Sequence, residues 1–318
     1  MESNAIPMEL WREVGWNGVR LSVPVSWHPS GIAADSLVFE KDASPVLTLK
    51  WEPARSRDAF RPGISRIRKG LPGNFRRTLR GAALPDPWRQ ALDGRFEEAD
   101  VEGARAFAWG GRAGGGEGLL LGSRQTRRVF LLHFHRVGSA VHATLPPGVL
   151  ASFRDGACGG RILWAVYDIR AELPEALRLV RHRFMPGAFE LVFRAGAATV
   201  RLCRWGPASV LLRNTTLQAF ASTRFTVPSD RFERDPAAGA EAVRWMDGHA
   251  PPRALQRLIQ AVLRRQARMG KAWRLPGENK ILAVQIEAGA LPPGNVLDDL
   301  CGSFHCLPPG GEGPAPPP

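Results

Sequence analysis

The stretch 190–208, ELVFRAGAATVRLCRWGPA, decides how this chain is organised, because the earlier stretch 36–54, SLVFEKDASPVLTLKWEPA, aligns with it without a gap at an offset of 154. Eight of the nineteen aligned positions are identical. In the second copy these positions are Leu191, Val192, Phe193, Ala197, Val200, Trp205, Pro207 and Ala208. The match predicts one domain that is present twice.

Each copy has the pattern of a β-hairpin. Leu-Val-Phe is a short run of strand-forming residues, a turn-rich tetrapeptide follows, and the next residues alternate between apolar and polar. Pro53 and Pro207 then end the second strand, because proline has no N–H to donate. The gapless alignment predicts that Trp51 and Trp205 occupy equivalent core positions and that Phe193 is buried.

The repeat divides the chain into two domains of ordinary size. We expect the first repeat over residues 1–155, a short Gly-rich linker over 156–160 and the second repeat over 161–306. The tail 307–318, LPPGGEGPAPPP, has the composition of a disordered or polyproline-like segment.

Apolar spacing predicts several helices between the strands. Apolar residues within 60–71 have the spacing of one helical face, which predicts a helix there. Pro-Gly followed by apolar residues predicts a closing helix at 145–153 and again at 291–304. A long helix is expected over 252–271. The predicted fold class is therefore α+β, with two tandem copies of a mainly antiparallel sheet flanked by helices.

Three segments of each half also resemble a known group of domains. They are a strand over 18–24, the first hairpin and the apolar helix over 149–153 that ends in Ser-Phe, each with its second-half counterpart. Together they resemble the PsbP/DcrB-like α-β-α sandwich. This resemblance implies a small antiparallel sheet flanked by helices and mostly non-catalytic binding or assembly roles, and it assigns a function to no residue of this chain.

The chain is strongly basic, with a net charge of +13 and with arginine supplying all but five of its 43 basic residues. Genomic base composition contributes to such an arginine bias, so the charge alone does not identify a nucleic-acid partner. No run of about 18 apolar residues is present, which predicts no transmembrane helix. The N-terminal residues MESNAIPMELWREV lack the features of a signal peptide, and a cytoplasmic location is expected.

Three motifs have a chemical alternative to a structural interpretation. The glycine-rich run 109–118 suggests a phosphate loop, but a strand pattern follows it instead of a helix, so a hairpin loop is favoured. His133 and His135 would share one face of a strand, and a third ligand would be needed for zinc. Cys301, His305 and Cys306 are close in sequence but also lack a partner cluster, so we predict neither a metal nor another cofactor.

The basic segment from Pro252 to Arg274 is the strongest binding candidate. No acidic residue occurs within it, and its predicted helix would place a stripe of positive charge on one side. The expected anion-binding residues are Arg257, Arg264, Arg268 and Lys271. A solvated outer face, an acidic protein, a nucleic acid and an anionic membrane surface all remain open as interpretations.

The sequence as a whole favours a non-catalytic binding or scaffold protein of unknown ligand. The alternatives are nonspecific nucleic-acid binding through the basic segment and a hydrolase without a recognisable motif. No nucleophile elbow and no cysteine with a patterned histidine is present, although catalytic residues need not be near one another in sequence.

Overall fold

The structure is a computed structural model of the 318-residue chain. It describes residues 10–54, 77–92, 101–111, 114–123, 125–135, 145–235, 241–248 and 267–307. Two compact units are present. The first comprises Met1–Cys158, Ala165–Tyr167 and Pro309–Pro318, and the second comprises Gly159–Trp164 and Asp168–Pro308.

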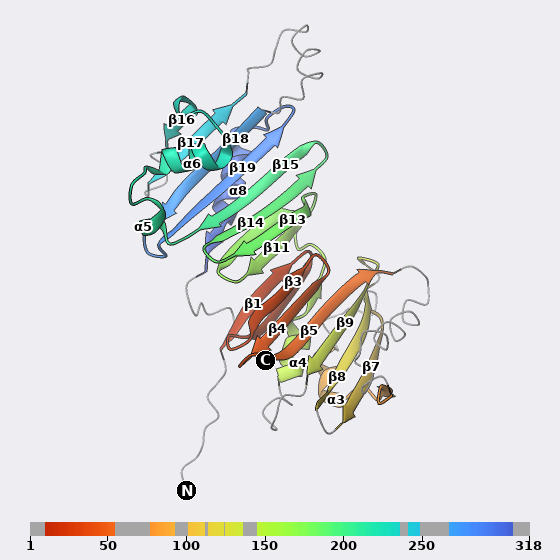
Figure 1. The fold of residues 1–318 in the computed structure, drawn as a ribbon. Helices are drawn as coiled ribbons and strands as arrows, with labels where there is room; N and C mark the ends of the chain where they lie inside the picture. The colour runs from red at the N-terminus through yellow and green to blue at the C-terminus, as the bar shows by residue number, and fades with distance from the viewer. Residues whose placement is uncertain are drawn as a thin grey trace. The chain divides into compact units, whose positions relative to one another are not determined.

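The first unit is built around an antiparallel sheet with the strand order β3-β4-β5-β9-β8-β7-β6 (Figure 1). Its strands are β3 (His28–Ala33), β4 (Ser36–Lys41), β5 (Ser44–Pro53), β6 (Arg80–Ala82), β7 (Val101–Gly111), β8 (Gly114–Ser123) and β9 (Arg128–His135). The described helices are α3 (Asp86–Leu92) and α4 (Leu145–Ser152). Strand β2 (Val19–Pro24) pairs with both β1 (Trp11–Trp16) and the short β10 (Arg154–Asp155).

The second unit repeats this arrangement, with the strand order β13-β14-β15-β19-β18-β17-β16. Its strands are β13 (Arg178–Met185), β14 (Ala188–Ala195), β15 (Ala198–Trp205), β16 (Phe232–Arg234), β17 (Ala242–Asp247), β18 (Ala267–Leu275) and β19 (Lys280–Ala288). Its helical segments are α5 (Ala208–Leu211), α6 (Leu217–Phe225), the 3₁₀ turn η2 (Ser229–Arg231) and α8 (Gly294–Ser303). Strands β11 (Arg161–Val166), β12 (Ile169–Pro174) and β20 (His305–Cys306) correspond to β1, β2 and β10. Each strand of the second sheet is thus numbered ten higher than its counterpart.

The predicted α+β class with helix-flanked sheets is wrong. The described chain is mostly strand, forms three antiparallel sheets and has few helices. A segment without a clear pattern, such as β6, becomes a strand because the neighbouring strand β7 supplies the backbone partners that its own sequence does not indicate. Part of the expected long helix, Ala267–Lys271, belongs to strand β18. The helix expected within 60–71 lies outside the described residues.

Two clusters of aromatic and aliphatic side chains show where α6 and α4 pack. Trp205 makes edge contacts with Phe220 and Phe225 of α6, so this side of the second sheet is the α6 side. In the first unit, Phe130 of β9 makes an edge contact with Phe153, directly after α4. Phe193 is completely buried and lies edge-on to Trp164 at 4.8 Å, as the prediction of a buried Phe193 requires.

Trp51 and Trp205 do not occupy equivalent positions, contrary to the prediction from the gapless alignment. Trp51 lies opposite Phe130, on the side of α4, whereas Trp205 faces α6. The pairing of β4 with β5 has a register shift after Phe39, and the pairing of β14 with β15 has none. A one-residue slip moves every later side chain to the other face of a strand.

A tryptophan and a glycine form the same contact in both sheets. Trp109 lies opposite Gly116, and Trp245 lies opposite Gly270. A Cβ added to Gly116 would lie 2.5 Å from the indole of Trp109, and one added to Gly270 would lie 2.2 Å from that of Trp245. Each glycine therefore provides the space in which the indole of the neighbouring strand packs flat on the sheet.

Candidate functional site

Five arginines gather on one side of strands β13, β14 and β15, and we call this surface the arginine face. Its members are Arg178, Arg181 and Arg183 of β13, Arg194 of β14 and Arg201 of β15. Directly paired residues of neighbouring strands share a face, and so do residues two or four positions apart in one strand. These rules place all five guanidinium groups on the α6 side of the sheet.

The pairing and the ion pairs confirm this placement. Arg183 lies opposite Glu190, and Arg178 lies opposite Arg194, which is four residues after Glu190. Glu190 accepts a 2.9 Å hydrogen bond from Arg181 and lies 3.4 Å from Nε of Arg201. Glu190 is thus shared by neighbouring guanidinium groups, and the positive charges outnumber it.

Arg178 and Arg194 form the least compensated part of the arginine face. Their Cα atoms are paired directly across the strands, both residues are exposed, and within the described residues neither forms an ion pair. Like charges directly opposite one another on an antiparallel pair destabilise the sheet. The folded unit therefore keeps an electrostatically unfavourable pair at its surface.

The sheet beneath this surface is apolar. Cys203 of β15 is buried, and burial raises the pKa of its thiol, with Glu190 adding to the increase while three guanidinium groups oppose it. Those groups belong to Arg201, Arg224 and Arg181. Arg224 is exposed on α6, so it brings a further positive charge to the border of the arginine face.

In the first unit, the strands equivalent to β13–β15 carry no such surface, although the sheet is the same. The equivalent strands β3, β4 and β5 contain no arginine, and their charges are those of Lys41, Lys50, Glu40 and Glu52, which sum to zero. Strands β13–β15 contain Arg204 in addition to the arginine face, with Glu190 as their single acidic residue. The fold does not require these arginines. A compositional bias towards arginine that acts on the whole chain does not explain why they occur on β13–β15 and not on β3–β5.

The structure describes two of the four predicted anion-binding residues and separates them. Arg257 and Arg264 lie outside the described residues. Arg268 is on strand β18, where it lies 3.4 Å from Glu287 and shares the α6 side with the arginine face. Lys271, three residues later on the same strand, points to the opposite side and lies 2.7 Å from Asp235.

Lys271 belongs to a nearly buried charge cluster. Asp235 also accepts a 2.6 Å hydrogen bond from Arg244, which in turn contacts Asp298 of α8. These two cations lower the pKa of Asp235 to about 2. Because Asp235 already neutralises its charge, Lys271 is not available to an external anion. Arg244 is the member of the cluster that connects it to α8.

His133 and His135 are brought together as predicted for residues two apart on one strand. Their rings stack at 3.6 Å, and Trp109 meets His133 edge-on at 3.9 Å. Burial lowers the pKa of His133 to about 2, aided by the positive charges of His135 and Lys50, and burial lowers that of His135 to about 4. Both imidazoles are therefore neutral near pH 7, but no cluster of three potential metal ligands occurs among the described residues.

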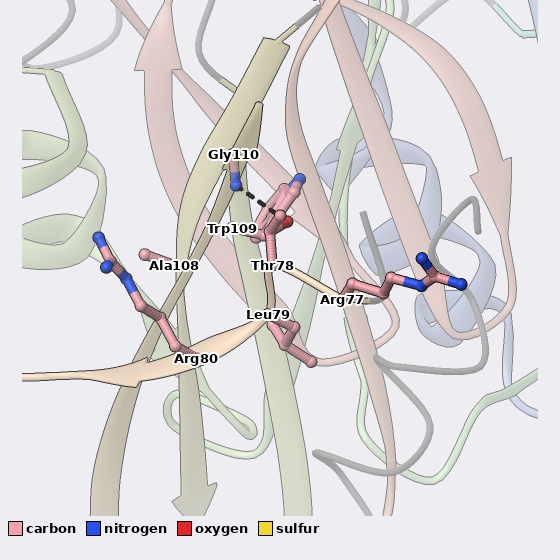
Figure 2. A pocket seen from close by; sticks show the side chains of 7 residues that line it. All are labelled: Arg77, Thr78, Leu79, Arg80, Ala108, Trp109 and Gly110. Atoms are coloured by element: carbon pink, nitrogen blue, oxygen red, sulfur yellow. Dashed lines mark hydrogen bonds between the residues drawn. The ribbon is translucent and has the colours of Figure 1, made fainter. Parts of the chain in front are cut away.

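A hollow of about 580 Å³ lies beside β6 and β7 in the first unit. Arg77, Thr78, Arg80 and Trp109 contribute to its lining, and Thr78 accepts a 3.3 Å hydrogen bond from the backbone N–H of Gly110. Figure 2 shows the side chains of Arg77 and Arg80 pointing to opposite sides. Because these guanidinium groups diverge, the hollow does not surround an anion with converging donors.

The remaining motifs have structural roles. The glycine-rich run forms the ends of strands β7 and β8, in agreement with the favoured hairpin and not with a phosphate loop. Burial raises the pKa of Cys301 to about 12 and that of Cys306 to about 11, so both thiols are protonated near pH 7. His305, between them, is exposed. Protonated thiols are poor nucleophiles and poor metal ligands.

Comparison with known proteins identifies no family. No family model matches the chain, and no curated protein matches it. Among solved structures, the chain is similar to a double mutant of the vaccine antigen transferrin-binding protein B from Haemophilus parasuis, with 7% identity and a TM-score of 0.11. The alignment covers 85% of this chain and 65% of that one, and a TM-score this low supports no conclusion about fold or function.

None of the helices that the structure describes is long and apolar enough to cross a membrane.

Sequence reasoning overlooked the arginine face although a signal was available in the repeat itself. At the offset of 154, Arg194 replaces Glu40 and Arg201 replaces Leu47. A charge reversal between two copies of one strand marks a surface on which the copies differ in charge. The identities between the copies, in contrast, reflect the shared core.

Proposed function

We propose that this is a non-catalytic binding protein whose second unit binds an extended polyanion through the arginine face. The observation that supports this function is the difference between the two units. Five arginines and one glutamate occupy one side of β13–β15, and the equivalent strands of the first unit have no arginine and no net charge.

The chemistry of the arginine face suits a polyanion. Guanidinium groups stay charged at all physiological pH values and can donate two parallel hydrogen bonds to a phosphate, sulfate or carboxylate. Of the arginine face, Arg181 makes the closest contact with Glu190, and its side chain is still 62% exposed. An anion that lies across several strands would neutralise charges that the protein itself leaves uncompensated.

Heparin, a sulfated polyanion, is a suitable first probe for this function. The full chain should bind to a heparin column, and a variant with Arg178, Arg181, Arg183 and Arg194 changed to Gln should elute at clearly lower salt. A matched variant removes the same charge from exposed arginines elsewhere, namely Arg80, Arg89, Arg213 and Arg234. Equal elution of the two variants would contradict the proposed site, and no retention of the wild-type chain would contradict the proposed function.

A further inference from the structure

We infer that the polyanion is duplex nucleic acid, bound through its phosphates without sequence readout, and that Arg178 and Arg194 make the principal phosphate contacts. This inference depends on the proposed polyanion-binding function. It adds the class of partner and the residues that contribute most.

The first step concerns the position of Arg178 and Arg194. Directly paired side chains of an antiparallel sheet have Cβ atoms roughly 5 Å apart. Two guanidinium groups at this separation can each donate to the oxygens of one of two neighbouring phosphate groups, which replaces their mutual repulsion by two attractions. Arg181 and Arg201 are less effective in this role because Glu190 already shares their charge.

The second step concerns the extent of the arginine face. Neighbouring strands lie about 4.8 Å apart and residues along a strand advance by about 3.3 Å, so the face covers roughly 10 Å by 17 Å. A duplex carries one charge per about 1.7 Å of its axis, and therefore about ten phosphates over the longer dimension. The face is thus long enough for a single duplex to meet several arginines simultaneously.

The third step distinguishes a duplex from a single strand. Proteins that bind single strands without sequence preference stack the bases on aromatic side chains. The large apolar side chains that are exposed in the described residues are Leu10, Val180, Met185, Val210, Met246 and Val296, none of which is aromatic. Trp205, the aromatic residue on the arginine-face side of β15, is only 8% exposed. The face therefore offers phosphate contacts but no stacking platform.

The fourth step distinguishes nucleic acid from an anionic membrane and from an acidic protein. Stable membrane association through a basic patch usually requires an apolar or lipid anchor as well, and a protein partner usually requires an apolar centre in the interface. Two exposed apolar side chains belong to strand β13: Met185 lies at its end, and Val180 is the unpaired residue of the β-bulge between Arg178 and Arg181. Two isolated aliphatic side chains do not form an apolar centre, and a surface on which guanidinium groups predominate fits a phosphate backbone best.

The number of charges determines the expected salt dependence. If the five arginines, less the charge of Glu190, neutralise about four phosphates, log affinity should fall with log salt at a slope of about −3.6. This slope corresponds to a weakening of about 100-fold between about 50 and 200 mM salt. Loss of two phosphate contacts should change the slope to about −1.8.

The test measures anisotropy of a labelled DNA duplex of about 20 base pairs with the full chain at several salt concentrations. Two duplexes of unrelated sequence should bind equally, and both should bind more tightly than either single strand. The variant Arg178→Gln/Arg194→Gln should show the smaller slope, whereas Arg178→Lys/Arg194→Lys and the control Arg213→Gln/Arg234→Gln should keep the wild-type slope. Circular dichroism of each variant confirms that it is folded.

Several outcomes would overturn the inference, and they differ from failure of the proposed function. Binding to heparin but not to duplex DNA would refute the duplex partner and leave polyanion binding intact, whereas binding to neither would refute both. Tighter binding to phosphatidylserine vesicles or to a single strand would identify another partner. An unchanged slope in Arg178→Gln/Arg194→Gln would show that these residues are not the principal contacts.

Discussion

Replacing Asp235 by Asn should destabilise the second unit in a manner that depends on pH. Asp235 follows strand β16, and its side chain is only 6% exposed. Its carboxylate lies 2.6 Å from Arg244 and 2.7 Å from Lys271, which are paired on the neighbouring strands β17 and β18. Arg244 also contacts Asp298 of α8, so one buried carboxylate helps to join three strands and a helix.

The magnitude follows from the pKa of Asp235. Its value falls from 3.8 to about 2 in the folded protein, chiefly because Arg244 and then Lys271 donate hydrogen bonds to it. A folded-state pKa below the unfolded value means that the ionised group contributes stability above about pH 4 and loses it as the pH falls towards 2. The shift corresponds to about 2 kcal/mol at pH 7 and about 1 kcal/mol at pH 3. Because the substitution also leaves Lys271 nearly buried without its partner, the total loss at pH 7 should be about 2–5 kcal/mol.

The assay is urea unfolding of the full chain at pH 7 and pH 3, with the transition of the second unit followed separately. Asp230→Asn serves as the control, because that carboxylate is 76% exposed and lies 3.9 Å from its partner, Arg231. The difference between wild type and Asp235→Asn should shrink by about 1 kcal/mol on acidification. A difference that stays constant with pH, or that matches the control, would refute the reasoning.

Three further changes test the packing and the electrostatics. Phe193→Ala should cost the second unit about 3–5 kcal/mol, because the ring is fully buried against Trp164, and a loss below about 1 kcal/mol in urea unfolding would exclude a core role. Gly270→Ala should cost about 1–3 kcal/mol, since the new Cβ would lie 2.2 Å from the indole of Trp245, and an unchanged unfolding midpoint would argue against that close approach. Arg194→Gln should raise thermal stability by a few tenths of a kcal/mol, because it removes the like charge opposite Arg178, and a destabilised variant would indicate an unrecognised structural contact.

The repeat could be recognised from the sequence, but its register could not. The identities between the copies arise from core residues such as Leu37 and Leu191, which are both buried. The register shift after Phe39 depends on backbone pairing between strands and leaves no gap in the alignment, so Trp51 and Trp205 seemed equivalent by sequence yet face opposite sides. The low helix content was missed for a related reason, since strand partners distant in sequence determined what ambiguous segments became.

The candidate site could be anticipated only in its chemistry. Positive charge was considered as a binding feature, but a helical period was assigned to residues of which Arg268 and Lys271 lie on a strand. Alternation in a strand sends these two side chains to opposite sides, where Glu287 and Asp235 neutralise them. The arginine face was not visible in one strand alone, because it arises where three strands place isolated arginines side by side.

Chemical footprinting of arginines in the full chain tests the central claim most directly. Phenylglyoxal labels accessible guanidinium groups, and mass spectrometry gives the extent of labelling at each residue with and without heparin. We predict that heparin protects Arg178, Arg183 and Arg194, while the labelling of the exposed Arg80 and Arg213 stays unchanged. Unchanged labelling of the arginine face while heparin is bound, or protection confined to other arginines, would contradict the account.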